Sequence, residues 1–101
     1  MEFYEIEAEI YEKMGNEQKT FEVASKIEAL IEKKYTSKSI EMGLHLIEKG
    51  KKKGSFRYFN EALTLMQEGM NLLIEARYRD QLNIGNIYTQ MAAFNRELNN
   101  L

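Results

Sequence analysis

The chain has 101 residues, of which 44% are hydrophobic and 30% are charged, and its net charge is −2. This length and composition predict a single domain with its own core, and the absence of cysteine excludes disulfides, thiolate metal sites and a cysteine nucleophile. The apolar runs are far shorter than the roughly 20 residues that span a bilayer, and no basic stretch followed by an apolar run suggests a secretory signal. We therefore expect a cytoplasmic protein without a membrane span.

The charges are unevenly distributed along the chain. Residues 1–32 hold nine glutamates and three lysines, whereas residues 33–58 hold seven lysines, one arginine and two glutamates. Such asymmetry can mark an interaction face. Two oppositely charged segments that neutralise each other by packing together would give the same pattern.

The first two helices are predicted at about residues 2–14 and 17–34. The first has two adjacent apolar rows at helical spacing, one of Phe3, Ile6, Ile10 and Met14 and one of Tyr4, Ala8 and Tyr11. Gly15 suits the left-handed position after a helix, and Asn16 can cap the helix that follows. The second helix carries its apolar residues at Phe21, Ala24, Ile27, Leu30 and Ile31.

The third helix is predicted at about residues 38–50, with Thr36, Ser37 or Ser39 as its N-cap. The chain contains no proline, so glycine is the expected helix breaker. Residues 50–55 read Gly-Lys-Lys-Lys-Gly-Ser and contain no apolar residue. We therefore predict that the helix ends at Gly50 and that a loop runs from Lys51 to Tyr58.

The fourth helix, predicted at about residues 57–78, contains the most apolar stretch of the chain at residues 60–76. Its apolar residues form two overlapping rows, one of Phe59, Ala62, Met66 and Leu73 and one of Leu65, Leu72 and Ala76. An apolar arc of this width predicts neighbours on at least two sides. We therefore expect this helix to be the central element of the fold.

The fifth helix is predicted at about residues 82–100, with Asp80 or Asn83 as its cap. Its apolar residues alternate in steps of three and four, at Ile84, Ile87, Met91, Phe94, Leu98 and Leu101. This narrow seam is of the coiled-coil type. It predicts packing on one neighbouring helix, self-association, or a binding face for a helix that is not part of this sequence.

One spacing of small and large residues occurs in three of the predicted helices. The copies are Ala8-x-x-Tyr11-x-x-x-Gly15, Gly43-x-x-Leu46-x-x-x-Gly50 and Gly85-x-x-Tyr88-x-x-x-Ala92. The pattern resembles the first helix of a tetratricopeptide repeat (TPR), although Glu17 stands where that family prefers an aromatic residue. The resemblance implies an all-α fold of five antiparallel helices, arranged as two and a half TPR-like hairpins in a right-handed superhelix.

Residues 36–101 also resemble a second family. The fourth helix looks like the middle helix of a microtubule-interacting and trafficking (MIT) domain, with Phe94 near that family's aromatic position on the third helix. The MIT family usually carries acidic residues on this helix, where the present chain has Ala93 and Arg96. This alternative implies a three-helix MIT-type bundle plus an N-terminal hairpin.

Nothing in the sequence indicates catalysis, so we expect a protein that is not an enzyme and has no cofactor or metal. The only histidine is His45, and Glu41 and Glu48 lie about one helical turn to either side of it. A helical di-metal site needs paired Glu-x-x-His motifs, and the chain has no second histidine. A histidine that is hydrogen-bonded or exposed on its helix is the simpler interpretation.

A basic cluster lies beside aromatic residues between the third and fourth helices. It consists of Lys49, Lys51, Lys52, Lys53 and Arg57, with Phe56, Tyr58 and Phe59 beside them. Such a mixture can hold phosphates and stack on bases. The chain is acidic overall, whereas a nucleic-acid-binding protein usually has a broad basic face. We therefore expect a solvated loop or a contact to an acidic protein instead of nucleic acid.

The predicted function is a non-catalytic interaction module, an adaptor or scaffold that binds a peptide or a partner helix. TPR arrays line a groove with the first helices of their repeats, and this resemblance implies that the partner-binding residues are Glu5, Glu9, Glu12, Arg79, Asn86 and Gln90, together with Glu2. The glutamates would favour a basic ligand. The alternative is a helical oligomerisation unit, either MIT-like or a homo-oligomer formed through Ile84, Ile87, Met91, Phe94 and Leu98.

Overall fold

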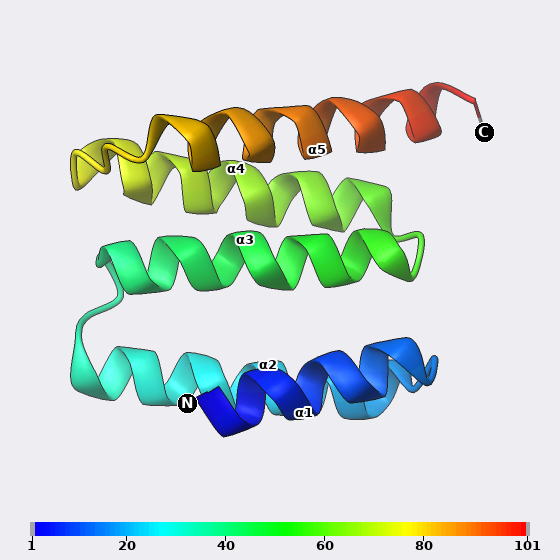
Figure 1. The fold of residues 1–101 in the computed structure, drawn as a ribbon, viewed down its shortest axis with the longest axis horizontal. Helices are drawn as coiled ribbons and strands as arrows, with labels where there is room; N and C mark the ends of the chain where they lie inside the picture. The colour runs from blue at the N-terminus through cyan, green and yellow to red at the C-terminus, as the bar shows by residue number, and fades with distance from the viewer. Residues whose placement is uncertain (1, 101) are drawn as a thin grey trace.

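The computed structural model describes residues 2–100 and consists of five helices: α1 (Glu2–Lys13), α2 (Glu17–Lys34), α3 (Ile40–Ser55), α4 (Phe59–Glu75) and α5 (Gln81–Asn99). The helices lie side by side, with the α1–α2 pair at one end, α3 and α4 next to it, and α5 on the far side (Figure 1). Residues 2–100 contain no strand, so the predicted all-α class is confirmed. Leu101 and the side chain of Glu2 lie outside the described part of the chain.

Three of the connections between helices use the same tight turn. One residue in each turn has a positive φ: Gly15 at 74°, Arg57 at 70° and Arg77 at 59°. The N–H of the following residue donates to the carbonyl five positions back, over 2.9 Å in each case: Asn16 to Tyr11, Tyr58 to Lys53, and Tyr78 to Leu73. This is the Schellman arrangement, which satisfies carbonyl groups at the end of a helix. It reverses the chain within a few residues and produces antiparallel neighbours.

Short polar side chains begin three of the helices. Asn16 Oδ1 accepts from the N–H of Lys19 over 3.1 Å, and Ser39 Oγ accepts from the N–H of Met42 over 3.1 Å. Asp80 Oδ1 accepts from the N–H of Asn83 over 3.0 Å. Each cap satisfies an N–H that has no partner inside the helix. All three residues are among the predicted caps.

The central helix is α4, as its wide apolar arc predicts. Ala62, Met66, Met70 and Leu73 are each 0% exposed. Ile47 of α3 and Ile87 and Phe94 of α5 join them in one core cluster. The cluster therefore spans α3, α4 and α5, and the prediction of neighbours on two sides of α4 is confirmed.

The helix α3 runs five residues past Gly50 and ends at Ser55, so the prediction of a loop starting at Lys51 was wrong. The two glycines serve close packing instead. A methyl group at Gly50 would lie 2.6 Å from Met66 Cγ, and one at Gly54 would overlap the ring of Phe94. Glycine is needed here because neighbouring groups approach the backbone of α3. The other helix ends differ from the predicted ones by at most three residues.

A second core cluster joins the α1–α2 pair to α3. It consists of Ala8, Val23, Ile27, Ile31 and Met42, and Tyr4, Tyr11, Leu46 and Leu72 pack against it. The row of Tyr4, Ala8 and Tyr11 therefore attaches α1 to the rest of the fold. The other apolar row of α1 is exposed.

The helix packing agrees with a series of antiparallel hairpins. The same helices can also be divided into three that share the α4 core and an N-terminal pair. Both arrangements expected from the sequence therefore remain compatible with the fold. None of the helices within residues 2–100 combines the length and apolar character needed to cross a membrane.

Candidate functional site

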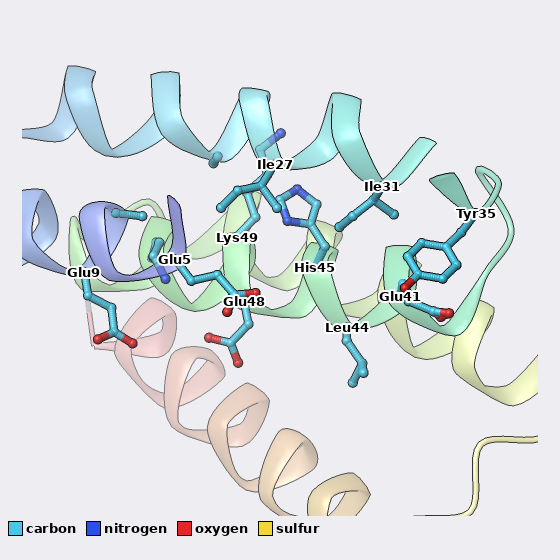
Figure 2. A pocket seen from close by; sticks show the side chains of 13 residues that line it. Glu5, Glu9, Ile27, Ile31, Tyr35, Glu41, Leu44, His45, Glu48 and Lys49 are labelled. Atoms are coloured by element: carbon cyan, nitrogen blue, oxygen red, sulfur yellow. The ribbon is translucent and has the colours of Figure 1, made fainter. Parts of the chain in front are cut away.

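A groove lies between α1 and α3, with α2 at its base (Figure 2). Its volume is about 450 Å³. We call it the α1–α3 groove. The residues that line it come from all three helices and from the start of the α2–α3 connection: Glu5, Ala8, Glu9, Ala24, Ile27, Ile31, Tyr35, Glu41, Leu44, His45, Glu48, Lys49 and Lys52.

The base of the groove is apolar. Ala8, Ala24, Ile27 and Ile31 lie at the bottom, each at most 6% exposed, and belong to α1 and α2. These positions follow helical spacing along α2, and the Tyr4, Ala8 and Tyr11 row sets α1 beside them. The groove therefore offers an apolar surface to a ligand side chain that enters it.

Carboxylates line the groove on both sides. Glu5 and Glu9 project from α1, and Glu41 and Glu48 project from α3 (Figure 2). Glu48 Oε1 is 3.2 Å from Lys51 Nζ. Within residues 2–100, the other three glutamates form no ion pair. Within this part of the chain, three carboxylates without an ion pair therefore line the groove, together with two lysines of α3, Lys49 and Lys52, of which Lys49 pairs with Glu28.

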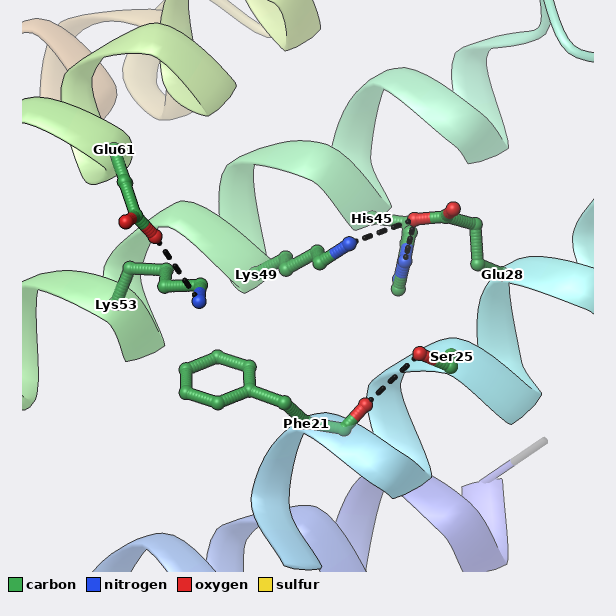
Figure 3. Close-up of polar contacts among 7 residues, drawn as sticks. All are labelled: Phe21, Ser25, Glu28, His45, Lys49, Lys53 and Glu61. Atoms are coloured by element: carbon green, nitrogen blue, oxygen red, sulfur yellow. Dashed lines mark hydrogen bonds and ion pairs between the residues drawn. The ribbon is translucent and has the colours of Figure 1, made fainter. Parts of the chain in front are cut away.

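A polar cluster joins α2 to α3, and two of its members, His45 and Lys49, also line the groove (Figure 3). His45 Nε2 lies 3.1 Å from Glu28 Oε1, and Lys49 Nζ lies 3.3 Å from the same oxygen. Because a carboxylate only accepts, the ring nitrogen that faces it carries the proton. Burial lowers the pKa of His45 below 6.5, while the hydrogen bond to Glu28 acts in the opposite direction. The histidine is thus hydrogen-bonded to a partner on another helix.

The predicted partner-binding residues do not all meet at this groove. Glu5 and Glu9 line it, whereas Glu12 is half-buried and lies outside its lining. Arg79 and Asn86 are exposed, and Gln90 is half-buried, all three away from the lining residues. Binding by any of these side chains stays a prediction.

Sequence reasoning missed the contribution of α3 to the groove. Glu41, Leu44 and Glu48 line it, and Ile27 and Ile31 form its base. The repeat pattern contained a usable signal, because α3 carries the middle copy of the same spacing. Ile27 and Ile31 were expected only as packing residues of the second helix.

The predicted seam on α5 is packed within the chain. Ile87 is 1% exposed and Phe94 is 7% exposed, and both belong to the α4 core. Ile84, Met91 and Leu98 are half-buried against the same cluster. Oligomerisation through these side chains stays a prediction, and it would require α5 to leave its place on α4.

The basic cluster is largely engaged in contacts within the protein. Besides Lys49 and Lys51, Lys53 Nζ is 3.1 Å from Glu61 Oε2 and 4.1 Å from the centroid of the Phe21 ring. Phe56 packs edge-on against Phe21, with ring centroids 5.8 Å apart, and Phe59 is buried against Phe94. Two of the three aromatic side chains in this cluster therefore already pack against other rings of the protein.

Within residues 2–100, no three histidine, aspartate or glutamate side chains converge to form a metal site. Comparison of the chain with protein-family models found no match, and comparisons with curated proteins and with solved structures found no significant similarity.

Proposed function

We propose that this chain is a non-catalytic protein-interaction module whose α1–α3 groove binds an extended basic segment of a partner protein. The observation that carries the proposal is the combination of an apolar base with carboxylates on both sides. An aliphatic side chain can fill the base while lysine or arginine side chains reach Glu5, Glu9 and Glu41. Charge-assisted hydrogen bonds of this kind are stronger than neutral ones.

A TPR-like arrangement is part of this proposal. The helices that line the two sides of the groove, α1 and α3, are those that carry the first and second copies of the repeated spacing. The connections α1–α2, α3–α4 and α4–α5 share one tight turn, whereas the connection α2–α3 between the two proposed hairpins lacks it. These features support two equivalent hairpins.

The test is a titration of ¹⁵N-labelled protein with two short peptides, one alternating lysine and leucine and one alternating glutamate and leucine. We expect the lysine peptide to shift the amide signals of Ile27, Ile31 and Leu44. The glutamate peptide should have little effect. Equal binding of the two peptides, or signal shifts confined to other surfaces, would contradict the proposal.

Charge reversal locates the site. The Glu5→Lys/Glu9→Lys variant should weaken binding of the lysine peptide by at least about tenfold, which corresponds to about 1.4 kcal/mol. The matched control is Glu68→Lys/Glu75→Lys, which makes the same charge change at exposed positions on α4 outside the groove. If both variants weaken binding equally, the effect comes from net charge and not from the groove.

A further inference from the structure

The outer face of α1 carries an uncovered apolar row. Phe3, Ile6, Ile10 and Met14 are 75%, 59%, 53% and 70% exposed. Their spacing places them on one side of the helix, next to the row of Tyr4, Ala8 and Tyr11 that attaches α1 to the core. We call the exposed set the outer row. A continuous apolar stripe on an exposed helix is typical of an interaction surface.

The internal repeat shows what covers the equivalent face in the later copies. When Ala8 is aligned with Gly43 and Gly85, Ile10 corresponds to His45 and Ile87, and Met14 corresponds to Lys49 and Met91. His45 and Lys49 both bond to Glu28 of the preceding helix, α2. Ile87 and Met91 pack into the cluster centred on the preceding helix, α4. In both cases a helix lies on this face, and within residues 2–100 no helix covers it on α1.

The charges around the outer row indicate which kind of partner would bind there. Glu5 and Glu12 lie on the side of α1 away from the outer row. The carboxylates that border the row are Glu7, beside Phe3 and Ile10, and Glu9, which lies beside Ile6 together with Lys13. A second copy of α1 would bring like charges together, which is unfavourable. A helix with lysine or arginine beside its apolar row would pair with these carboxylates instead.

We propose that the outer row of α1 is the docking site for an amphipathic helix of a partner protein, bordered by lysine or arginine. The partner helix would occupy the position that α2 has against α3 and that α4 has against α5. This is the helix-in-groove mode of recognition, in which apolar anchors recur at helical spacing. The outer row lies on a different side of α1 from Glu5 and Ala8 of the groove, and Glu9 lies between the two surfaces. The Ile6→Ser/Ile10→Ser and Glu41→Lys variants therefore distinguish the failure of one proposal from the failure of the other.

The probes are three peptides of about 18 residues, since shorter isolated helices are marginal in water. The first is a helix with a leucine row and lysines on both sides, the second has glutamates in place of the lysines, and the third has the composition of the first in scrambled order. Isothermal titration calorimetry should detect binding of the first alone. Equal binding of the scrambled or the glutamate peptide would overturn the proposal.

The decisive variant is Ile6→Ser/Ile10→Ser, which alters two exposed side chains and should leave the fold unchanged by circular dichroism. We expect the affinity for the lysine-bordered helix to fall at least about tenfold. The matched control is Ile74→Ser/Leu82→Ser, because these side chains are 59% and 78% exposed and lie on α4 and α5. A second control, Glu41→Lys, alters the groove and should leave docking of the helix unchanged. Unchanged affinity of the Ile6→Ser/Ile10→Ser variant would overturn the proposal.

Two further measurements test other occupants of the outer row. Light scattering over a concentration series would overturn the proposal if it found a dimer that Ile6→Ser/Ile10→Ser dissociates, because the row would then join two copies of the chain. Sedimentation with phosphatidylcholine and phosphatidylglycerol vesicles would overturn it if binding depended on the same residues. We expect a monomer and no vesicle binding.

Discussion

Glycine has two different roles in this chain. Between α3 and α4, a methyl group at Gly69 would lie 2.6 Å from the carbonyl oxygen of Gly43 and 2.7 Å from Ile47 Cγ1. At Gly85, on an exposed face of α5, an added methyl group would meet nothing within 4 Å. The first glycine lets two backbones approach, whereas the second carries only the entropic cost of glycine in a helix.

Alanine at these two positions should therefore change stability in opposite directions. Gly69→Ala should lower the free energy of unfolding by about 1–3 kcal/mol, because the opposing carbonyl belongs to the backbone and cannot move aside. Gly85→Ala should raise it by about 0.5–1 kcal/mol. Urea denaturation of both variants and the parent measures the difference. A stabilised Gly69→Ala variant would show that α3 and α4 lie farther apart than described.

The α1–α2 pair meets α3 through an interface that contains charge as well as apolar contacts. Glu28 on α2 bonds to His45 and Lys49 on α3, and Lys52 adds a further positive charge near the imidazole. His45 is 8% exposed, so its protonation would place a charge between the two helices. The contact between α2 and α3 should therefore depend on pH.

Acidification should destabilise the protein in a defined window. Because burial lowers the pKa of His45 in the folded state, the unfolded chain binds more protons just below pH 6.5. The free energy of unfolding should then fall as the pH decreases through that window and change little above it. Urea denaturation at several pH values from about 7.5 to about 5.5 tests this, since most glutamates titrate lower.

The His45→Gln variant distinguishes the effect of protonating this histidine from the effect of protonating carboxylates. The glutamine amide can still donate to Glu28, but it does not titrate. We expect the pH dependence above about 5.5 to shrink in this variant. If the parent and the variant lose stability equally over that range, His45 is not the responsible group.

Within residues 2–100 there are two apolar core clusters, and they differ in how completely they are enclosed. The α4 cluster includes four side chains with 0% exposure, whereas the cluster joining α1 and α2 to α3 lies beside the open groove. Residues 35–38, which connect α2 to α3, are all exposed. The N-terminal pair therefore has fewer contacts that resist local opening.

Hydrogen exchange should differ between the α1–α2 pair and the helices of the α4 cluster. We expect the slowest amides in α3 and α4, with α1 and α2 opening at a free energy at least about 1 kcal/mol lower. Native-state exchange followed by NMR gives the opening free energy for each amide. Equal protection across all five helices would instead indicate a single cooperative unit.

Local chemistry explains what could be predicted from the sequence. The caps at Asn16, Ser39 and Asp80 and the left-handed Gly15 depend on side chains and dihedral angles within a few residues. The wide apolar arc of α4 likewise predicts its central place. Of the residues that line the groove, Glu5 and Glu9 were expected as binding residues, and this expectation depended on the resemblance to a TPR, because helical spacing alone does not show which side of α1 lines a groove.

Long-range packing decided the features of the fold and of the groove that the sequence did not reveal. Gly50 and Gly54 look like helix breakers, but they lie inside α3 because Met66 and Phe94 come from distant helices to fill the space. Both apolar rows of α1 have helical spacing, and only the position of α2 decides which one is buried. The groove exists because α1 and α3 stand apart over α2. Sequence therefore determined the helices and most of their ends, while tertiary structure decided where α3 ends and which helix faces are buried, because burial depends on residues far apart in the chain.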